Sequence, residues 1–448
     1  MSSTIVAVAT ATTISSIAIV RVSGSRALEI ARKITKKDSF NFKERYANLL
    51  SLYNREGILI DQGIVIYFKS PKSFTGEDIV EFQCHGGYIV ANEILETAIF
   101  YGARLAEAGE FSKRAFLNGK IDLTKAEAIS KLIEAKSLEG AKILARQLKG
   151  ELKEFIDSAR EELLRAISYA EVMIDYAEED IPEDIIENLK SQLESLESRL
   201  EEIVESSKRR KGLIQGFRVA IIGKPNVGKS SLLNSLLNYD RAIVSNIAGT
   251  TRDTIEEEIR VGNHIVRLID TAGIRETIDE VEKIGVGRSI SSIADADIVI
   301  AMFDNSSIFS DEDRKIVDIL EENRDKNIIV ALNKIDLEGK FDTSIIEKFD
   351  YVEISAKKDY KSLVDRLIKI LDSIGESQEP MLVSNRQIEA VLKAKEAILN
   401  AKAPLLNGEL EIFSYHLQDS VKFLSSISKP FDSEEILDKM FSEFCLGK

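Results

Sequence analysis

The chain of 448 residues contains few of the side chains that build disulfide-linked or metal-bound frameworks. It has only two cysteines, Cys84 and Cys445, and three histidines. Two cysteines give no disulfide framework, and so small a set of cysteines and histidines argues against a structural zinc site. A reducing, cytoplasmic location is therefore expected.

Long apolar runs are also absent. No stretch reaches the ~18 apolar residues that span a bilayer, so no contact with a membrane is expected. Residues 4–20 are apolar, but no Lys or Arg precedes them and Thr and Ser interrupt them. We therefore expect buried strands there, not a signal peptide. The net charge of −15 argues against indiscriminate binding to nucleic acids.

A phosphate-binding loop is present in the middle of the chain. Residues 223–230 (GKPNVGKS) have two glycines at P-loop spacing, followed by Lys229 and Ser230. An apolar run, residues 219–222, precedes the loop, and a helical pattern, residues 231–237, follows it. Glycines let backbone N–H groups cradle phosphates, Lys229 reaches the β- and γ-phosphates, and Ser230 holds Mg²⁺.

Four later segments indicate that the nucleotide is GTP. Residues 333–336 (NKID) follow an apolar strand at 328–332, and a carboxylate at Asp336 can accept from the two N–H groups of guanine. Residues 355–357 (SAK), after a strand at 351–354, match a loop that closes over the base. Residues 270–273 (DTAG) are expected near Mg²⁺ and the γ-phosphate, and residues 249–253 (GTTRD) supply a switch threonine.

The hydrolytic machinery differs from that of Ras-like proteins in one respect. A glutamine there follows the Asp-x-x-Gly segment and orients the attacking water, but Ile274 occupies that position here. No arginine finger can be assigned from the sequence. The side-chain carbonyl of Asn226 in the P-loop can instead help to hold a monovalent cation.

The pattern along the chain predicts a multidomain α/β protein. Residues 1–118 mix strands at 5–9, 17–22, 63–68 and 79–84 with helices at 27–34 and 88–100, an α+β pattern. Helical spacing, as in Leu189, Leu193, Leu196 and Leu200, fills residues 124–211 and returns at 385–444. We therefore expect an all-α domain from residues 119–212 and 376–448, interrupted by a Ras-like α/β GTPase domain at 213–375, in which Gly262-Asn263 joins two strands as a hairpin.

Three smaller features have structural interpretations. Residues 208–211 (KRRK) are interpreted as a solvated helix end before a linker. Cys84 and His85 are interpreted as a buried thiol and a turn histidine rather than functional groups. Cys445 is open to either interpretation, because a thiol on a flexible terminal segment can be reactive.

Over essentially its full length the chain resembles the MnmE (TrmE) family of tRNA-modification GTPases. The resemblance rests on residues 74–78 (FTGED), 84–87 (CHGG), 109–120 (GEFSKRAFLNGK) and 444–448 (FCLGK), in addition to the GTPase segments. One departure is residues 11–16 (ATTISS), where the family has a Pro/Gly-rich loop. The missing glycines remove left-handed backbone conformations from that loop.

The resemblance implies a homodimer joined by N-terminal domains that bind a tetrahydrofolate one-carbon donor, and GTPase domains that meet across K⁺. With an FAD-containing partner, MnmG (GidA), such proteins add an aminomethyl-type group to carbon five of the tRNA wobble uridine. It also implies that Glu282 positions the hydrolytic water. The folate contacts fall on Arg21, Glu81, Lys120 and Lys448, the K⁺ contacts on Asn226, Ser245, Ile247 and Thr250, and the Mg²⁺ contacts on Ser230 and Thr251.

Asn226, Lys229 and Glu282 are the expected catalytic residues. The residues expected to contact GTP are Asn226, Val227, Gly228, Lys229, Ser230, Ser231, Ser245, Asn246, Ile247, Ala248, Gly249, Thr250, Thr251, Asp270, Thr271, Ala272, Gly273, Asn333, Lys334, Asp336, Ser355, Ala356 and Lys357. Two alternatives stay open at this point. One is a GTP-regulated scaffold or assembly factor, and the other is a folate-dependent one-carbon transferase with GTPase regulation.

Overall fold

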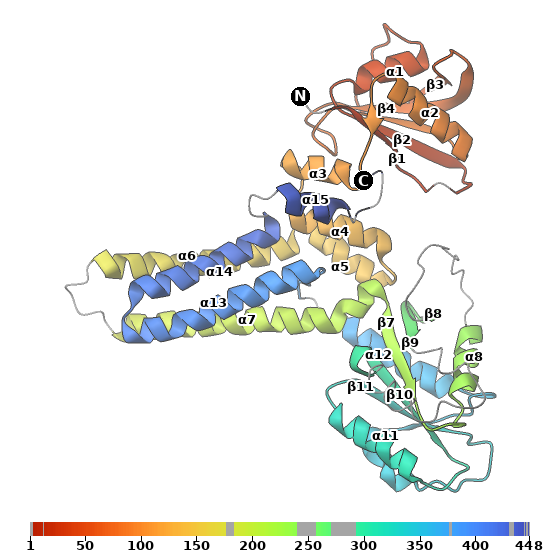
Figure 1. The fold of residues 1–448 in the computed structure, drawn as a ribbon, viewed down its shortest axis with the longest axis vertical. Helices are drawn as coiled ribbons and strands as arrows, with labels where there is room; N and C mark the ends of the chain where they lie inside the picture. Colours follow the sequence, from red (N-terminus) through yellow and green to blue (C-terminus); the bar gives the residue numbers. More distant parts are fainter. Residues whose placement is uncertain are drawn as a thin grey trace. The chain divides into compact units, whose positions relative to one another are not determined.

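The computed structural model describes residues 3–11, 13–175, 183–239, 257–269, 293–375, 379–429, 434–442, 444 and 447. The chain divides into two compact units (Figure 1). The first comprises Met1–Ser130, Ile156–Asp175 and Leu410–Lys448, and the second comprises Lys131–Phe155 and Tyr176–Glu409. Each unit is described by itself.

The first unit contains a six-stranded sheet in the order β3-β4-β5-β2-β1-β6. All pairs are antiparallel except β1 with β6. The strands are β1 (Ile5–Val8), β2 (Ile17–Ser23), β3 (Asn48–Tyr53), β4 (Leu59–Phe68), β5 (Ile79–His85) and β6 (Arg104–Leu105). The four strands predicted from the sequence are present. β3 and β6 were not predicted, because β3 does not alternate cleanly and β6 has only two residues.

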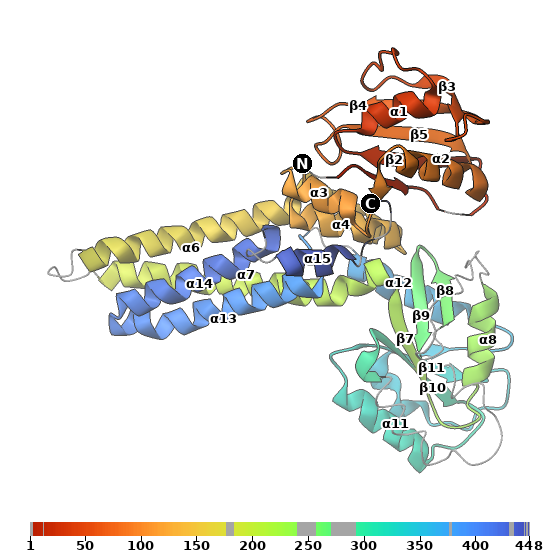
Figure 2. The same ribbon diagram turned by 45° about the horizontal axis from the view of Figure 1, so that its top comes forward.

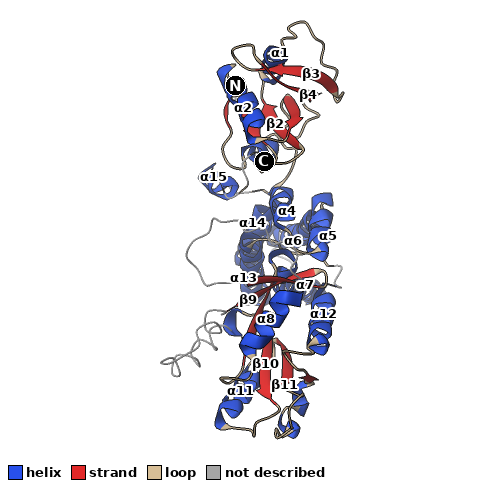
Figure 3. Cartoon of the chain, turned by 90° about the vertical axis from the view of Figure 1, so that its right-hand side faces the viewer, coloured by secondary structure: helices blue, strands red, loops and turns tan. Residues whose placement is uncertain are grey.

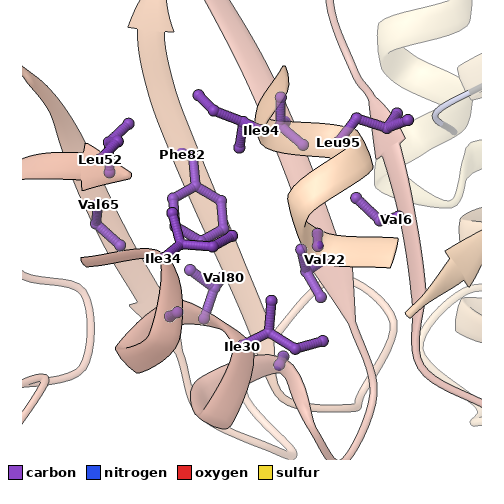
Figure 4. Close-up of a cluster of buried hydrophobic side chains, with 14 of the residues drawn as sticks. Val6, Val22, Ile30, Ile34, Leu52, Val65, Val80, Phe82, Ile94 and Leu95 are labelled. Atoms are coloured by element: carbon purple, nitrogen blue, oxygen red, sulfur yellow. The ribbon is translucent and has the colours of Figure 1, made fainter. Parts of the chain in front are cut away.

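Two helices, α1 (Ala27–Thr35) and α2 (Tyr88–Phe100), supply the core on one face of this sheet. Alternate residues of β2 and β5 point toward them, as period-two strands require. Phe82 and Val80 of β5 lie against Ile34 and Ile30 of α1 (Figure 4). The predicted helical ranges agree with these bounds to within one residue.

The other face is partly covered by α3 (Glu110–Leu117), whose Phe111 is buried with Ile5 and Ala7 of β1. A neighbouring apolar cluster joins α3 and α4 (Leu123–Glu134) to the C-terminal helix α15 (Glu434–Ser442). Phe441 and Phe444 lie in this cluster, and Lys113 of α3 pairs with Asp438 of α15. α15 is thereby held against α3 and α4.

The second unit contains a six-stranded sheet in the order β12-β11-β10-β7-β9-β8, parallel except for β8. The strands are β7 (Phe217–Ile222), β8 (Glu257–Val261), β9 (His264–Ile269), β10 (Ile298–Asp304), β11 (Asn327–Asn333) and β12 (Val352–Glu353). The neighbouring strands β10 and β11 are visible in Figure 3. The accompanying helices are α8 (Lys229–Tyr239), α11 (Asp311–Glu322), η1 (Thr343–Ile345), η2 (Glu347–Phe349) and α12 (Lys361–Gly375). Gly262, at φ 60°, turns the predicted hairpin between β8 and β9.

The remaining elements are long helices: α5 (Leu138–Lys149), α6 (Glu151–Asp175), α7 (Glu183–Gln215), α13 (Asn385–Asn407) and α14 (Leu410–Ser428). The leucines that predicted α7 by their spacing are all buried. α7, before the inserted α/β part, lies beside α13, which follows it (Figures 1 and 2). Lys395 and Lys402 of α13 pair with Glu201 and Glu197 of α7. The predicted fold class is confirmed.

One prediction about the helix end is wrong. Lys208, Arg209 and Lys211 are exposed as expected, but Arg210 is only 2% exposed. Its guanidinium donates to the backbone oxygens of Glu379 and Pro380 at 3.0 and 2.9 Å. Burial lowers the pKa of Arg210, and the backbone carbonyls provide the hydrogen bonds that a buried cation requires.

In the described part of the chain, no helix is both long enough and apolar enough to span a bilayer.

Candidate guanine-nucleotide site and a second charged site

The P-loop connects β7 to α8. Gly223 and Gly228 have φ angles of 154° and 109°, and Asn226 has φ 60°. A Cβ atom on Gly228 would collide with the side-chain amide of Asn333. Glycine at this position therefore lets another loop approach the backbone of the P-loop closely.

The side chain of Lys229 lies over the earlier residues of the P-loop. Its Nζ donates to the backbone oxygens of Gly223 and Lys224 at 2.6 and 3.0 Å. Burial lowers the pKa of Lys229, while the charge of Glu312 acts to raise it. This ammonium group is therefore placed at the N-terminus of α8, where phosphate oxygens bind in P-loops.

A single side chain joins the P-loop to both base-recognition segments. Asn333, the last residue of β11, is 2% exposed. Its amide nitrogen donates to the backbone oxygen of Val227 at 2.7 Å, and its amide oxygen accepts from the backbone N–H of Ala356 at 2.8 Å. The predicted segments 223–230, 333–336 and 355–357 therefore lie together.

Asp336 presents a carboxylate beside this junction. Its Oδ2 lies 2.9 Å from Nζ of Lys358. Hydrogen bonds from Lys358 and Ser355 lower the pKa of Asp336, so the group is ionised at neutral pH. An ionised carboxylate at this position can accept two N–H groups from the edge of a guanine base.

The loop that carries Ala356 is fixed against α8. Ser235 of α8 donates to the backbone oxygen of Ala356 at 2.6 Å and accepts, through its own backbone oxygen, from the hydroxyl of Tyr360 at 3.0 Å. Neither Ser235 nor Tyr360 was predicted. Both residues support the loop that is expected to face the base, and neither belongs to a recognisable motif.

Asp304 is a further acidic group that the sequence analysis missed. It ends β10 in register with Asn333, and its Oδ2 lies 2.6 Å from Nζ of Lys334. The sequence could have indicated Asp304 as a site residue, because polar residues at the carboxyl ends of neighbouring parallel strands share one edge of the sheet.

The remaining predicted residues of the nucleotide and metal sites lie outside the described part of the chain. They are Ser245, Asn246, Ile247, Ala248, Gly249, Thr250, Thr251, Asp270, Thr271, Ala272, Gly273 and Glu282. Ile274 lies outside it as well.

A second charged site is present on the N-terminal sheet. Arg21 of β2 and Glu81 of β5 are register partners and form an ion pair at 2.8 Å. The Arg21 guanidinium lies 5.9 and 5.7 Å from the ring centroids of Phe74 and Phe111. Arg21 therefore lies close to two aromatic rings in a partly buried position.

Two further predicted folate contacts concern chain segments near this site. A Cβ on Gly76 would touch the Lys120 side chain, so Lys120 lies at the loop that carries Phe74. Lys448 is not among the described residues, but its neighbour Gly447 lies against Val8, at the end of β1.

Cys84 is not a reactive group. Its thiol is buried beside the backbone oxygen of Ala18, and burial raises its pKa to about 11. The thiolate is therefore scarce at neutral pH. His85, by contrast, is exposed, and its Nδ1 lies 2.7 Å from Asp61. Cys445 lies outside the described residues.

The sheet, parallel except for β8, the P-loop after β7 and the carboxylate of Asp336 in the loop after β11 define a P-loop GTPase.

Comparison with known proteins identifies the family. The family model for the GTP-binding protein TrmE N-terminus matches residues 4–120, and the model for the MnmE helical domain matches residues 123–445. The tRNA modification GTPase MnmE of Sulfurovum sp. (strain NBC37-1) is 65% identical over 100% of this chain and 99% of the relative. The proteins of the same name from Aliarcobacter butzleri (strain RM4018) and Sulfurimonas denitrificans (strain ATCC 33889 / DSM 1251) are 57% and 56% identical, each over 99% of both chains. The chain belongs to the MnmE/TrmE family of tRNA modification GTPases.

We expect Asp336→Asn to weaken GTP binding by at least about a hundredfold and to create a preference for xanthosine triphosphate. A site that recognises a base by hydrogen bonds discriminates strongly against a base whose donors and acceptors no longer match it. The new amide can donate to the exocyclic oxygen of xanthine, which guanine lacks at that position. Binding of both nucleotides would be measured by competition. Asp325→Asn, an exposed aspartate in the same unit, is the control. Unchanged GTP affinity would show that Asp336 does not face the base.

Proposed function

We propose that GTP hydrolysis by this chain drives conformational change in a complex that modifies the wobble uridine of tRNA. In this proposal an aminomethyl-type group is added at carbon five, with a tetrahydrofolate derivative as one-carbon donor and an FAD-containing partner of the MnmG (GidA) type. The chain acts in the cytoplasm as a homodimer. The domain boundaries predicted from the sequence are part of the proposal.

The observation that carries this proposal is the presence of two separate charged sites in one chain of this family. The site around Asn333 suits GTP. The site around Arg21 suits an anionic, aromatic molecule, because it offers a guanidinium beside the partly exposed ring of Phe74. The assembly-factor alternative does not require the Arg21 site, whereas the transferase alternative uses both sites and is separated from the proposal by the analysis of wobble uridine.

In the nucleotide site, each residue has a stated task. The P-loop backbone and Lys229 bind the phosphates. Ser230 and Thr251 hold Mg²⁺, which neutralises charge on the β- and γ-phosphates. Glu282 orients the attacking water. Asn226, with Ser245, Ile247 and Thr250, holds K⁺, which supplies the positive charge that an arginine finger supplies in other GTPases.

The conformation of Asn226 is compatible with this task. It is exposed, and its backbone has the left-handed φ angle of 60°. Within the described residues its amide makes no hydrogen bond, so its oxygen can serve as a ligand. A neutral amide oxygen suits a weakly hydrated monovalent cation.

In the N-terminal site, the partly exposed ring of Phe74 contacts the pterin ring, and the cations Arg21, Lys120 and Lys448 bind the carboxylates of the glutamate tail. Glu81 fixes the Arg21 guanidinium and can accept a hydrogen bond from the ligand. α15 is fastened to α3 by Phe441 and by the Lys113–Asp438 pair, and this supports a role for the C-terminal segment in the site.

The central test is analysis of wobble-uridine modification in a deletion strain that carries plasmid copies of the gene. Wild type restores the modification, whereas Glu282→Ala does not and lowers GTP turnover by more than about tenfold, the low end for loss of a positioned catalytic group. Glu280→Ala, two residues away in the same segment, is the matched control. Normal wobble uridine in the deletion strain would refute the function, and normal turnover in Glu282→Ala would refute the role of that residue.

The cation is tested by comparing salts. We expect GTP hydrolysis by the wild type to be at least about tenfold faster in KCl than in NaCl at equal ionic strength, a modest part of what electrostatic stabilisation of a transition state contributes. The reason is that Na⁺ is too small for the same set of ligands. Asn226→Ala should abolish this difference and bind GTP nearly as well as wild type. Equal turnover of the wild type in both salts would eliminate K⁺ from the mechanism.

The folate site is tested by removing residues 445–448. We expect 5-formyltetrahydrofolate binding to fall by at least about tenfold, the loss of one charge-assisted contact, and wobble modification to be lost, while basal GTP hydrolysis persists. Arg21→Ala should have the same effect, and Arg55→Ala, an exposed arginine of the same unit, should have none. Full folate affinity in the truncated protein would remove Lys448 from the site.

A further inference from the structure

The segment that follows β10, residues 304–313, lies between the two halves of the nucleotide site. β10 is flanked by β7, which leads into the P-loop, and by β11, which leads into residues 333–336. None of the residues in this segment belongs to a recognised nucleotide-binding motif. Each half of the site nevertheless sends one lysine into the segment.

The first of these lysines is Lys224 of the P-loop. Its Nζ lies 2.7 Å from Oδ2 of Asp313 and 2.9 Å from Oγ of Ser307. Asp313 has no exposed side-chain surface, and the same Oδ2 also accepts from the hydroxyl and backbone N–H of Ser310 at the start of α11. A buried carboxylate requires a counter-ion. Lys224 is therefore held firmly to the N-terminus of α11.

The constraint on Lys224 reaches the phosphate-binding side of the loop. The backbone oxygen of Lys224 accepts from Nζ of Lys229. Lys224 therefore connects Asp313 through its side chain to Lys229 through its backbone oxygen.

The second lysine is Lys334, in the segment that reads the base. Its backbone has φ 65°, a left-handed conformation that a lysine adopts at a cost in free energy. Its Nζ lies 2.6 Å from Oδ2 of Asp304, whose other oxygen accepts from the backbone N–H and hydroxyl of Ser306. The backbone N–H of Asn305 also donates to the backbone oxygen of Asn333 at 2.9 Å.

Asp304 remains charged in this arrangement. Burial acts to raise its pKa, but the hydrogen bonds from Lys334 and Ser306 outweigh burial and lower it. Because the Asp304 carboxylate is fixed by its hydrogen bonds to Ser306, the ion pair restricts the position of the Lys334 ammonium group.

We infer that residues 304–313 form a brace that fixes the P-loop relative to the guanine-binding segment, and that Asp304, Ser307 and Asp313 are positioning residues for GTP. Asp304 acts through Lys334, and Ser307 and Asp313 act through Lys224. The inference rests on the GTP site alone and is independent of the tRNA and folate proposals.

The test uses the full chain and GDP carrying a methylanthraniloyl label, with equilibrium affinity and dissociation rate measured in Mg²⁺ buffer. We expect Asp304→Asn to raise Kd about tenfold, mainly through faster dissociation, which corresponds to the loss of one charge-assisted hydrogen bond. In a Lys334→Met background the same substitution should change Kd by less than about twofold, because its partner is already absent. Asp318→Asn, an exposed aspartate on α11, is the matched control.

A merely structural role is distinguished by thermal unfolding of the nucleotide-free protein. Variants that only lower stability would bind labelled GDP normally at temperatures at which they are fully folded. The contact between the brace and Lys224 of the P-loop is tested with Ser307→Ala, which removes one partner of Lys224 without leaving a buried charge. This variant can be measured even if Asp313→Asn fails to fold. We expect Ser307→Ala to raise Kd about threefold.

Two results would overturn the inference. One is a Kd within twofold of wild type for both Asp304→Asn and Ser307→Ala. The other is an undiminished tenfold effect of Asp304→Asn in the Lys334→Met background, which would show that Asp304 does not act through Lys334.

Discussion

The nucleotide site depends on the two hydrogen bonds of one buried amide. Asn333 donates to Val227 and accepts from Ala356, residues that lie 106 and 23 positions away along the chain. Loops that follow three different strands are thereby fixed relative to one another with a single side chain. An amide is suited to this task because it donates on one side and accepts on the other, and both bonds are shielded from water. Gly228 completes the arrangement, since any larger residue would displace the amide.

The parts of the fold that sequence predicted well are those set by local patterns. α13 begins at Asn385 as predicted, because Ser384 caps it by accepting from the backbone N–H of Gln387. The spacing of leucines in α7 and the two-residue turn at Gly262 are local signals of the same kind. The three nucleotide-binding segments were found because each carries its own motif, and the sheet edge brings them together.

The parts that sequence missed depend on contacts between distant residues. Nothing in the run 208–211 distinguishes Arg210 from its three exposed neighbours, because its burial is decided by carbonyl groups about 170 positions away. Asp304 and Asp313 are single carboxylates whose lysine partners lie in other loops. In the N-terminal unit, the motifs at 74–78 and 109–120 meet in a buried ion cluster, in which Arg114 bonds both Glu77 and Glu110. Although burial acts to raise the pKa of Glu110, hydrogen bonds from Arg104 and Arg114 lower it to about 2.

Arg210 also joins the two chain connections between the inserted α/β part and the helices that flank it. The chain enters this domain from α7 with only Gly216 before β7, and it leaves through the segment that leads from α12 to α13. Arg210 fastens the entering helix to the leaving segment at Glu379 and Pro380, and Ser207 accepts from the backbone N–H of Leu382 at 2.8 Å. The two connections therefore cannot move independently without breaking bonds of a buried cation, which is costly. The ion pairs Lys395–Glu201 and Lys402–Glu197 continue this connection along α7 and α13, so the two helices that flank the inserted part are joined both at its entry and along their length.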